Sequence, residues 1–146
     1  MTTGSSKPMI DSAYLRAKLE YEITPAALKN LLERPPNNVC VVDVRDAAQY
    51  DVGHIPRARN VPLDTLVSSF ISLPKDMMIV TYCGDSACGL SPQAALELAR
   101  KGFPVRHLIG GFAEWSREGF PIETTPSPAP SQAGREASRA GTTHFK

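Results

Sequence analysis

The stretch MMIVTYCGDSACGLSPQAALELARKG, residues 77–102, decides the fold class of this chain. Residues 77–82 form an apolar run that is typical of a strand buried on both faces of a sheet. A loop of small residues follows, and residues 92–101 have the composition of a helix that ends at Gly102. A strand that passes through a short loop into a helix is the repeating unit of an α/β protein with a parallel sheet.

The rest of the chain repeats this alternation. Thr24 is a typical helix N-cap and Pro25 a typical first helical residue. Further strands are predicted over residues 39–44 and 105–109, with a brief extended segment over residues 58–63. Further helices are predicted from residue 10 onward and over residues 25–33, 47–52, 63–70 and 112–119. The pattern predicts an open, largely parallel α/β sheet.

The length and the composition predict one domain with two disordered ends. A chain of 146 residues is long enough to bury one sizeable core. Residues 1–9 are small and polar, and residues 124–146 are rich in Pro, Ser, Ala and Gly, so neither segment can bury enough apolar surface to order itself. The domain, with an extra N-terminal helix, is predicted over residues 10–123.

The charge and the cysteine content exclude several classes of partner. The formal net charge is +1, and residues 1–123 alone hold 13 basic and 14 acidic side chains, a net charge of −1. No basic face is therefore expected for nucleic acid or for an anionic membrane. The first residues lack the apolar segment of an export signal, and no later apolar run is long enough to span a bilayer. Three cysteines in such a chain indicate free thiols in a reducing compartment, so a cytoplasmic location is expected.

Cys83 lies where the chemistry of an open parallel sheet is expected. It directly follows the predicted strand 77–82, and ligands of such sheets bind beyond the carboxyl ends of the strands. The loop can turn its N–H groups toward one point, and the following helix adds partial positive charge. These surroundings lower the pKa of a thiol toward neutrality and produce a thiolate nucleophile. The small residues that permit this curl are Gly84, Ser86, Ala87 and Gly89.

The two loop cysteines allow other interpretations. A structural zinc site needs about four ligands, and only His54, His107 or Cys40 could complete one, so no metal site is predicted. The spacing of Cys83 and Cys88 is C-x-x-x-x-C rather than the C-x-x-C of a thioredoxin-type pair. Both thiols could also be bystanders, because cysteine often packs as a small apolar residue. Cys40 lies among valines within a predicted strand and is interpreted as a core residue.

Six further signals occur in order between residues 23 and 122. They are Asp43-Val44-Arg45 after an apolar strand, Tyr50 followed by GHIPRARNVPL, Tyr82-Cys83 at the end of a strand, Ala94-Ala95 with Gly102-Phe103, Gly110-Gly111, and Trp115 with Gly119-Phe120-Pro121. Together they resemble the pattern of single-domain rhodaneses. The resemblance implies a five-stranded parallel sheet with helices on both faces. It also implies a sulfurtransferase in which the Cys83 thiolate takes a sulfane sulfur from a donor and a thiophilic acceptor then removes it from the persulfide.

The resemblance also assigns roles to other residues. Neither a metal nor an organic cofactor is implied. Asp43 and Arg45 are interpreted as an ion-paired support for the loops near the site, His54 as a loop-fixing side chain and Trp115 as a packing residue. The predicted substrate-binding loop consists of Gly84, Asp85, Ser86, Ala87, Cys88 and Gly89.

The active loop departs from the common pattern C-x-x-G-x-R-S-x-x-A-A. Seven residues separate Cys83 from Ser91 where the pattern has five, and the loop carries Asp85 but no arginine or lysine. A basic residue stabilises an anionic substrate, so phosphatase or arsenate-reductase activity and efficient use of free thiosulfate are not expected. Arg57 stands where the family usually has glycine, so Arg57 and Arg59 are candidates to restore the missing charge.

Cys88 stands where the common pattern has its arginine. It is either a resolving thiol that attacks a Cys83 persulfide or sulfenate to give an internal disulfide, or a residue that packs beneath the loop. The first hypothesis is a sulfurtransferase or persulfide carrier with polysulfide or a protein persulfide as donor and a thiol or a protein as acceptor. The alternatives are a thiol redox protein that cycles a Cys83–Cys88 disulfide and a non-catalytic binding module. The sequence leaves the oligomeric state open.

Overall fold

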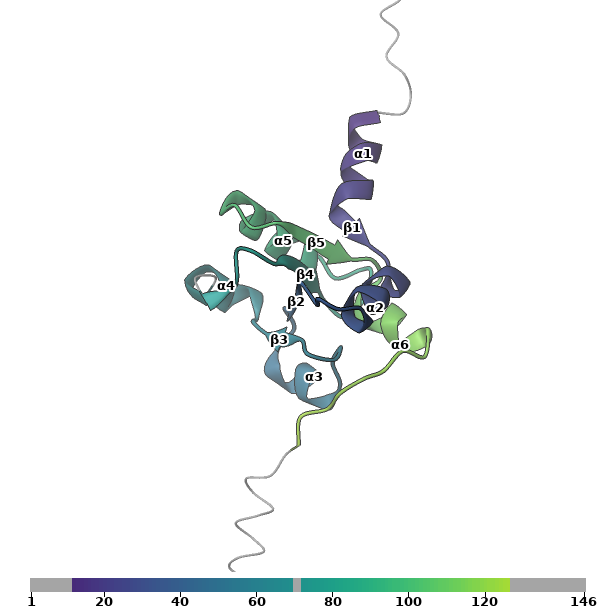
Figure 1. Cartoon of the computed structure of the whole chain (residues 1–146). Coiled ribbons are helices and arrows are strands. Elements are labelled where there is room, and N and C mark those ends of the chain that lie inside the picture. The colour runs from purple at the N-terminus through teal and green to yellow at the C-terminus, as the bar shows by residue number, and fades with distance from the viewer. Residues whose placement is uncertain (1–11, 70–71, 127–146) are drawn as a thin grey trace, which may run out of the picture.

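A computed structural model describes residues 12–69 and 72–126 of the chain. Five strands form one parallel sheet in the order β1-β5-β4-β2-β3 (Figure 1). They are β1 (Glu22–Ile23), β2 (Val39–Asp43), β3 (Arg59–Asn60), β4 (Met78–Tyr82) and β5 (Val105–Leu108). The predicted α/β class and the five-stranded parallel sheet are confirmed.

The strands β2 and β4 form the longest ladder of the sheet. They pair over five residues, from Val39 opposite Met78 to Asp43 opposite Tyr82. Their last four positions are all buried, as expected for apolar strands with a helical layer on each face. Because both strands end at the same level, Asp43 and Tyr82 lie side by side at the carboxyl edge of the sheet, immediately before Cys83.

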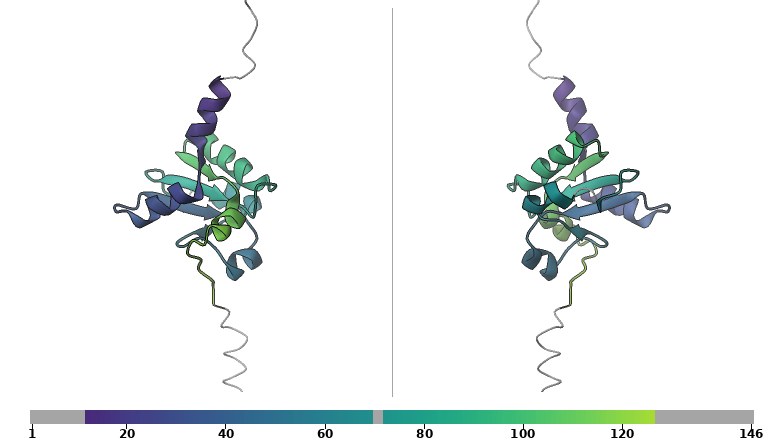
Figure 2. Two further views of the ribbon diagram at one scale, coloured as in Figure 1. Left: turned by 90° about the vertical axis from the view of Figure 1, so that its right-hand side faces the viewer. Right: turned by 90° about the vertical axis from the view of Figure 1, so that its left-hand side faces the viewer.

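Helices cover both faces of this sheet (Figure 2). The helices α2 (Pro25–Glu33) and α6 (Gly111–Arg117) pack on one face, where Leu28, Tyr82 and Trp115 belong to a common buried cluster. The helices α4 (Leu63–Ser69) and α5 (Leu90–Arg100) pack on the other face. Cys83 belongs to the cluster on the α4 and α5 face, so its side chain points to the side of the sheet where α5 begins.

The helix boundaries follow local signals that the sequence displays. Thr24 caps α2, because its Oγ1 accepts a hydrogen bond of 3.2 Å from the N–H of Ala27. The short helix α3 (Ala47–Val52) ends at Gly53, as predicted. The helix α5 begins at Leu90, two residues earlier than predicted, and this start shortens the active loop. Phe70, the last residue of another predicted helix, lies outside the described residues.

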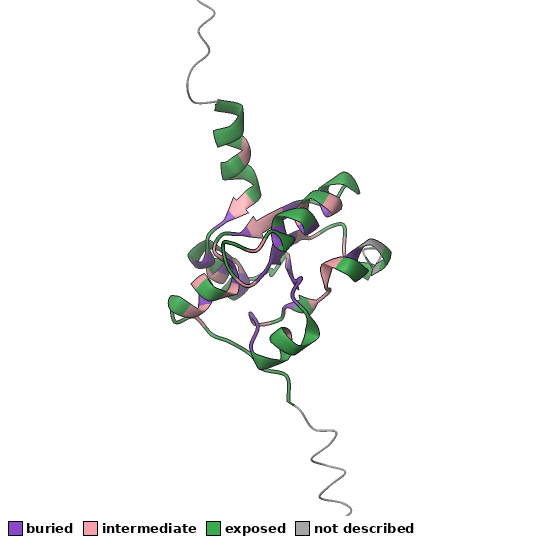
Figure 3. Cartoon of the chain, turned by 180° about the vertical axis from the view of Figure 1, so that it is seen from behind, coloured by how far each residue is buried: buried purple, intermediate pink, exposed green. Residues whose placement is uncertain are grey.

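The N-terminal helix α1 (Ser12–Tyr21) projects away from the sheet and has no buried residue (Figures 1 and 3). The disorder predicted for residues 1–9 and for most of residues 124–146 falls outside the described residues, so it stays a prediction. The described chain contacts the rest of the domain as far as Thr125, whose N–H donates to the carbonyl of Asp51 at 3.0 Å. Within residues 12–69 and 72–126, no helix combines the length and the apolar character needed to cross a membrane.

Candidate functional site

The predicted nucleophile lies in a tight loop between β4 and α5. Cys83 follows Tyr82, the last residue of β4, and the loop ends at Gly89 before α5 begins. Cys83 is only 4% exposed, whereas Cys88 is partly buried and packs against the same apolar cluster. Of the two loop cysteines, Cys88 is therefore the one that solvent reaches more readily.

The two loop cysteines are joined to each other. A disulfide links Cys83 to Cys88, with 6.3 Å between their Cα atoms. This distance lies within the range of about 4.4–6.8 Å that disulfides span. The expectation of free thiols is therefore wrong for this pair, and it holds for Cys40, which is free and buried. Burial raises the pKa of the Cys40 thiol, which keeps it protonated and inert within β2.

Asp85 stabilises the loop through hydrogen bonds to the backbone of the same loop. Its Oδ1 accepts hydrogen bonds from the N–H groups of Ala87 (3.0 Å) and Cys88 (3.2 Å). The loop sequence predicts that the N–H groups of the whole loop converge on the bound sulfur. In the structure, these two N–H groups are satisfied by a side chain of the same loop. Asp85 is thus a loop-ordering residue as well as the source of negative charge that its sequence position indicates.

The start of α6 supports the loop from the other side. The N–H groups of Phe112 and Ala113 each donate to a loop carbonyl at 2.8 Å, those of Cys83 and Gly84 respectively. This close approach requires glycine at position 111. A Cβ atom there would lie 2.6 Å from the carbonyl oxygen of Cys83, and the φ of Gly111 is +62°. The pair Gly110-Gly111 belongs to the sequence pattern, but the pattern does not indicate this contact.

Because Gly111 lies so close to the carbonyl of Cys83, a methyl group added at position 111 is expected to destabilise the folded protein. We expect Gly111→Ala to lower the free energy of unfolding by about 1–3 kcal/mol, because the new methyl clashes with the backbone and the φ is unfavourable. Urea denaturation measures the change. Gly84→Ala is the matched control for stability, since a Cβ at Gly84 meets nothing within 4 Å. Equal stability of the two variants would contradict this account of Gly111.

Asp43 and Arg45 form a buried pair behind the loop. Asp43 is 0% and Arg45 6% exposed, and Arg45 Nη2 donates to Asp43 Oδ2 at 2.6 Å. The same Nη2 donates to the carbonyl of Gly53 at 2.7 Å, and the guanidinium lies 4.5 Å from the ring centroid of Phe112. The pair thereby holds the α3 end and the α6 start together, and the N–H of Phe112 in turn contacts Cys83.

Tyr82 completes this buried polar group. Its hydroxyl accepts a hydrogen bond of 3.1 Å from the N–H of Ile55. Burial, with the negative charge of Asp43 as the next cause, raises the pKa of the Tyr82 phenol far above its usual value. Tyr82 is therefore a neutral, fixed hydrogen-bonding residue and does not exchange protons with the site.

Neither candidate arginine restores positive charge at the loop. Arg57 Nη2 donates to the carbonyl of Leu32 at the end of α2, at 2.6 Å, and Arg59 Nη1 donates to the carbonyl of Ser72 at 3.4 Å. Neither residue lines the cavity that contains Cys83. His54 likewise serves the fold, because its ring stacks on Tyr50 with 3.7 Å between centroids.

A cavity of about 160 Å³ lies over the two cysteines. Besides Cys83 and Cys88, it is lined by Asp85 and Ser86 of the loop and by Ser91 at the start of α5. Glu22 of β1 and His107 of β5 also line it, with no lysine or arginine among its lining residues. Neither Glu22 nor His107 is among the site residues predicted from the sequence. Both come from strands at one side of the sheet, and only the strand order brings them to Cys83.

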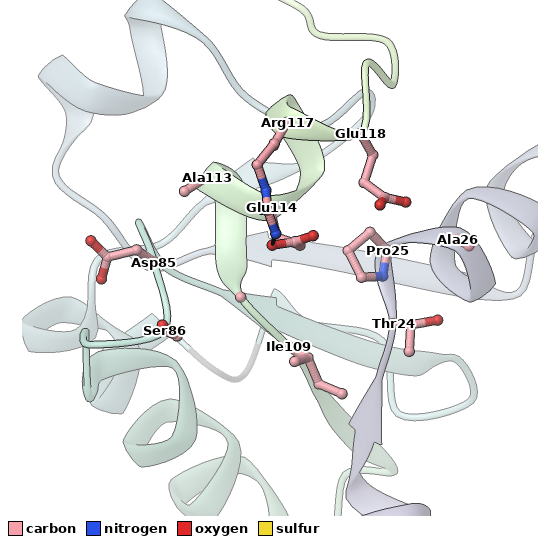
Figure 4. A pocket seen from close by; sticks show the side chains of 11 residues that line it. Thr24, Pro25, Ala26, Asp85, Ser86, Ile109, Ala113, Glu114, Arg117 and Glu118 are labelled. Atoms are coloured by element: carbon pink, nitrogen blue, oxygen red, sulfur yellow. Dashed lines mark hydrogen bonds and ion pairs between the residues drawn. The ribbon is translucent and has the colours of Figure 1, made fainter.

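A second, more open cavity of about 540 Å³ adjoins the first (Figure 4). It lies between the start of α2 and the helix α6, and the loop residues Asp85 and Ser86 border both cavities. Glu114 and Arg117 of α6, and Glu118 directly after it, project toward this cavity (Figure 4). The two cavities therefore meet at the loop.

The arrangement supports sulfur chemistry at a loop cysteine. Among residues 12–69 and 72–126, no three His, Cys, Asp or Glu side chains lie close enough to hold a metal ion. The loop offers one enclosed sulfur, one more accessible sulfur and a cavity over them whose lining includes the side chains of Glu22, Asp85 and His107. These groups suit nucleophilic attack by a thiolate and exchange between sulfurs.

Comparison with known proteins shows the family. The family model described as the rhodanese-like domain matches residues 24–118 of this chain. A sulfurtransferase of Allochromatium vinosum is 36% identical over 86 residues, which cover 58% of this chain and 78% of that protein. The HTH-type transcriptional regulator Rv0324 of Mycobacterium tuberculosis is 36% identical over 104 residues, which cover 71% of this chain and 45% of the regulator. This chain thus spans less than half of the regulator.

A solved structure has a similar fold. The BH2092 protein of Bacillus halodurans is similar with a TM-score of 0.72 and 36% sequence identity, over 77% of this chain and 83% of that protein. Residues 24–118, which match the family model, contain Cys83 and the buried pair Asp43 and Arg45. They also contain Gly110 and Gly111 at the start of α6. The chain belongs to the rhodanese-like family.

Proposed function

We propose that this protein is a sulfurtransferase that carries sulfane sulfur on Cys83 and resolves the loaded state with Cys88. The observation that carries the proposal is the position of the two sulfurs, which are within bonding distance at the carboxyl edge of the sheet. The family and the sulfurtransferase among its relatives support the reaction class. The cavity over Cys83 supplies the space for a small donor.

The chemistry proceeds in two steps. The Cys83 thiolate attacks the outer sulfur of a polysulfide or of a persulfide, so a new S–S bond forms and the shortened donor leaves with the electron pair. A thiol or protein acceptor then takes the outer sulfur from Cys83. Without an acceptor, the Cys88 thiolate attacks the Cys83 sulfur, the Cys83–Cys88 disulfide forms, and hydrosulfide leaves with the electron pair. An external thiol reduces the disulfide and restores both cysteines.

The charge of the site supports a donor other than free thiosulfate. Glu22 and Asp85 line the cavity over Cys83, and no lysine or arginine balances them there. A dianion entering this cavity meets negative charge with no guanidinium to stabilise it. A persulfide carries one negative charge and a polysulfide chain separates its two charges, so the terminal sulfur of either brings less charge into the cavity than thiosulfate does.

A thiol redox function is the second candidate, and the Cys83–Cys88 disulfide is the observation that favours it. In that case the pair cycles between dithiol and disulfide without ever carrying an extra sulfur. The same loop serves either function, so the state of the sulfurs after exposure to a donor distinguishes them.

Intact mass after donor treatment tests the proposal. The reduced protein, Cys83→Ser and Cys88→Ser are each incubated with polysulfide or thiosulfate. We expect Cys88→Ser to gain one sulfur from polysulfide, the unmodified chain to lose its two thiol hydrogens with release of sulfide, and Cys83→Ser to remain unchanged. Oxidation of the unmodified chain without any sulfur adduct in Cys88→Ser would favour the redox function. No change with any donor would favour a non-catalytic binding module.

A further inference from the structure

A row of polar side chains crosses the sheet beneath the two cysteines. Glu22 of β1 lies opposite His107 of β5, and His107 lies opposite Thr81 of β4. Residues in register on neighbouring parallel strands point to the same face of the sheet. Thr81 is two residues before Cys83, so this face is the one toward which Cys83 points.

Both ends of this row are fixed. His107 Nε2 lies 3.4 Å from Glu22 Oε2, and the other carboxylate oxygen of Glu22 accepts a hydrogen bond of 2.7 Å from Lys18 of α1. At the other end, the Thr81 hydroxyl is 3.0 Å from both the carbonyl and the hydroxyl oxygen of Ser91. Glu22 therefore holds the imidazole in one orientation from the side opposite Thr81.

The row opens into the cavity over the disulfide. Glu22, His107 and Ser91 line the same cavity of about 160 Å³ as Cys83 and Cys88. A space of that size holds about five water molecules at their volume in the liquid. A proton can therefore pass between the imidazole and the sulfurs through a short chain of water. The His107 side chain is about one-quarter exposed, so it also exchanges protons with solvent.

No other group of this cavity combines these properties. Asp85 from the loop is the remaining carboxyl group there, and Lys18 from α1 acts on the imidazole only through Glu22. From α5 the cavity receives Ser91 and Pro92, neither of which titrates near neutral pH. Among the described residues that line the cavity, His107 alone can become a cation, and an imidazole changes its charge in the physiological pH range.

We propose that His107, positioned by Glu22, is the acid–base partner of Cys83. This assignment deepens the proposed function and rests on sulfur exchange at Cys83. When an external thiolate attacks the more accessible Cys88 sulfur, a mixed disulfide forms, the Cys83–Cys88 bond breaks and the electron pair moves to Cys83. The His107 imidazolium gives its proton to the Cys83 thiolate and is reprotonated from solvent. In the reverse direction, the neutral imidazole takes the proton of the Cys83 thiol and produces the nucleophile.

The reduction rate of the oxidised protein tests this assignment. Oxidised chains are mixed with excess dithiothreitol from about pH 5.5 to about pH 8.5, across the titration range of an imidazole, and the rate is divided by the thiolate concentration of the reductant. For the unmodified protein we expect this corrected rate to rise as the pH falls. For His107→Gln we expect a corrected rate that does not change with pH and that is lower by about 100-fold at the acidic end, the lower limit of the usual range for general acid catalysis.

Two further variants separate proton transfer from structural damage. Glu22→Gln keeps the imidazole beside a polar side chain, so we expect the corrected rate still to rise as the pH falls. Arg106→Gln changes the neighbouring residue of β5, which does not line the cavity, and we expect the profile of the unmodified protein. Added imidazole should restore part of the rate of His107→Gln.

The outcomes distinguish this inference from the proposed function. An unchanged pH profile in His107→Gln, or an equal loss in Arg106→Gln, would overturn the role of His107 even when Cys83 takes up sulfur. A loss specific to His107→Gln, in a protein whose Cys83 takes up no sulfur from any donor, would support the acid–base role and contradict the sulfurtransferase. Because the reduction assay uses no sulfur donor, the two results are independent.

Discussion

Replacement of Cys83 by serine is expected to lower the rate of sulfur transfer from polysulfide to cyanide by at least about 1000-fold. The reason is chemical, because a serine hydroxyl is not ionised at neutral pH and forms no persulfide. Colorimetric detection of thiocyanate measures the rate. The effect should reach this size because Cys40 is buried within β2 and the proposed function assigns only the resolving step to Cys88.

The other two cysteines are the controls for this experiment. Cys40→Ala should retain the rate of the unmodified protein, because the Cys40 thiol is buried and held protonated. Cys88→Ser should also turn over, and should do so without the lag that reduction of a Cys83–Cys88 disulfide imposes. A Cys83→Ser variant that retained a rate within about 10-fold of the unmodified protein would show that another group carries the sulfur.

Replacement of Arg45 by methionine is expected to lower the free energy of unfolding by about 3–5 kcal/mol, the usual consequence of leaving one partner of a buried ion pair without the other. Asp43 is 0% exposed, and Arg45 is its ion-pairing partner at 2.6 Å. Burial alone would lower the pKa of Arg45, but the hydrogen bonds and the charge of Asp43 outweigh burial and raise that pKa. The arginine is therefore charged, and its loss leaves a buried carboxylate.

A surface pair provides the matched control. Arg100 pairs with Glu97 on α5 at 3.1 Å, and its side chain is 64% exposed. Arg100→Met should cost under about 1 kcal/mol, because solvent screens an exposed pair. Urea denaturation of both variants measures the difference. Combining Arg45→Met with Asp43→Asn should recover part of the stability, since the buried charge is then gone. Equal losses for Arg45→Met and Arg100→Met would contradict a structural role of the buried pair.

The strands and helices could be predicted because local signals determine them. The runs that form β2 and β4 are apolar except for Asp43 at the end of β2 and Thr81 within β4, which is typical of strands covered on both faces. Thr24, Pro25 and Gly53 mark helix ends by backbone preferences that do not depend on distant contacts. The position of Cys83 follows directly, because a loop after a central parallel strand reaches the carboxyl edge of the sheet.

The cavity side chains could not be predicted in the same way. Glu22 and His107 lie 85 residues apart, from 22 to 107, and they meet because β1 adds to the edge of the sheet beside β5. The strand β1 has only two residues and carries no apolar run that would reveal its partner. A register of strands is a tertiary property, and the polar row across the sheet depends entirely on it.

The predictions about charge near the active loop were only partly right, because they depend on which groups each charged side chain contacts. Asp85 is correctly recognised as negative charge in the loop, but its hydrogen bonds to the N–H groups of Ala87 and Cys88 depend on side-chain orientation, which loop composition does not determine. Arg57 and Arg59 lie close to the site in the family pattern, yet their guanidinium groups donate to the carbonyls of Leu32 and Ser72. Long cationic side chains reach several neighbours, so sequence position alone does not indicate which one they contact.

The most direct test of the central claim is the location of the transferred sulfur in Cys88→Ser. In this variant Cys83 is the only cysteine left between residues 76 and 100. After treatment with polysulfide, alkylation and digestion, the peptide that contains Cys83 should carry one additional sulfur between Cys83 and the alkyl group. An unmodified Cys83 peptide, or the extra sulfur on Cys40, would contradict a Cys83 persulfide and with it the proposed sulfurtransferase.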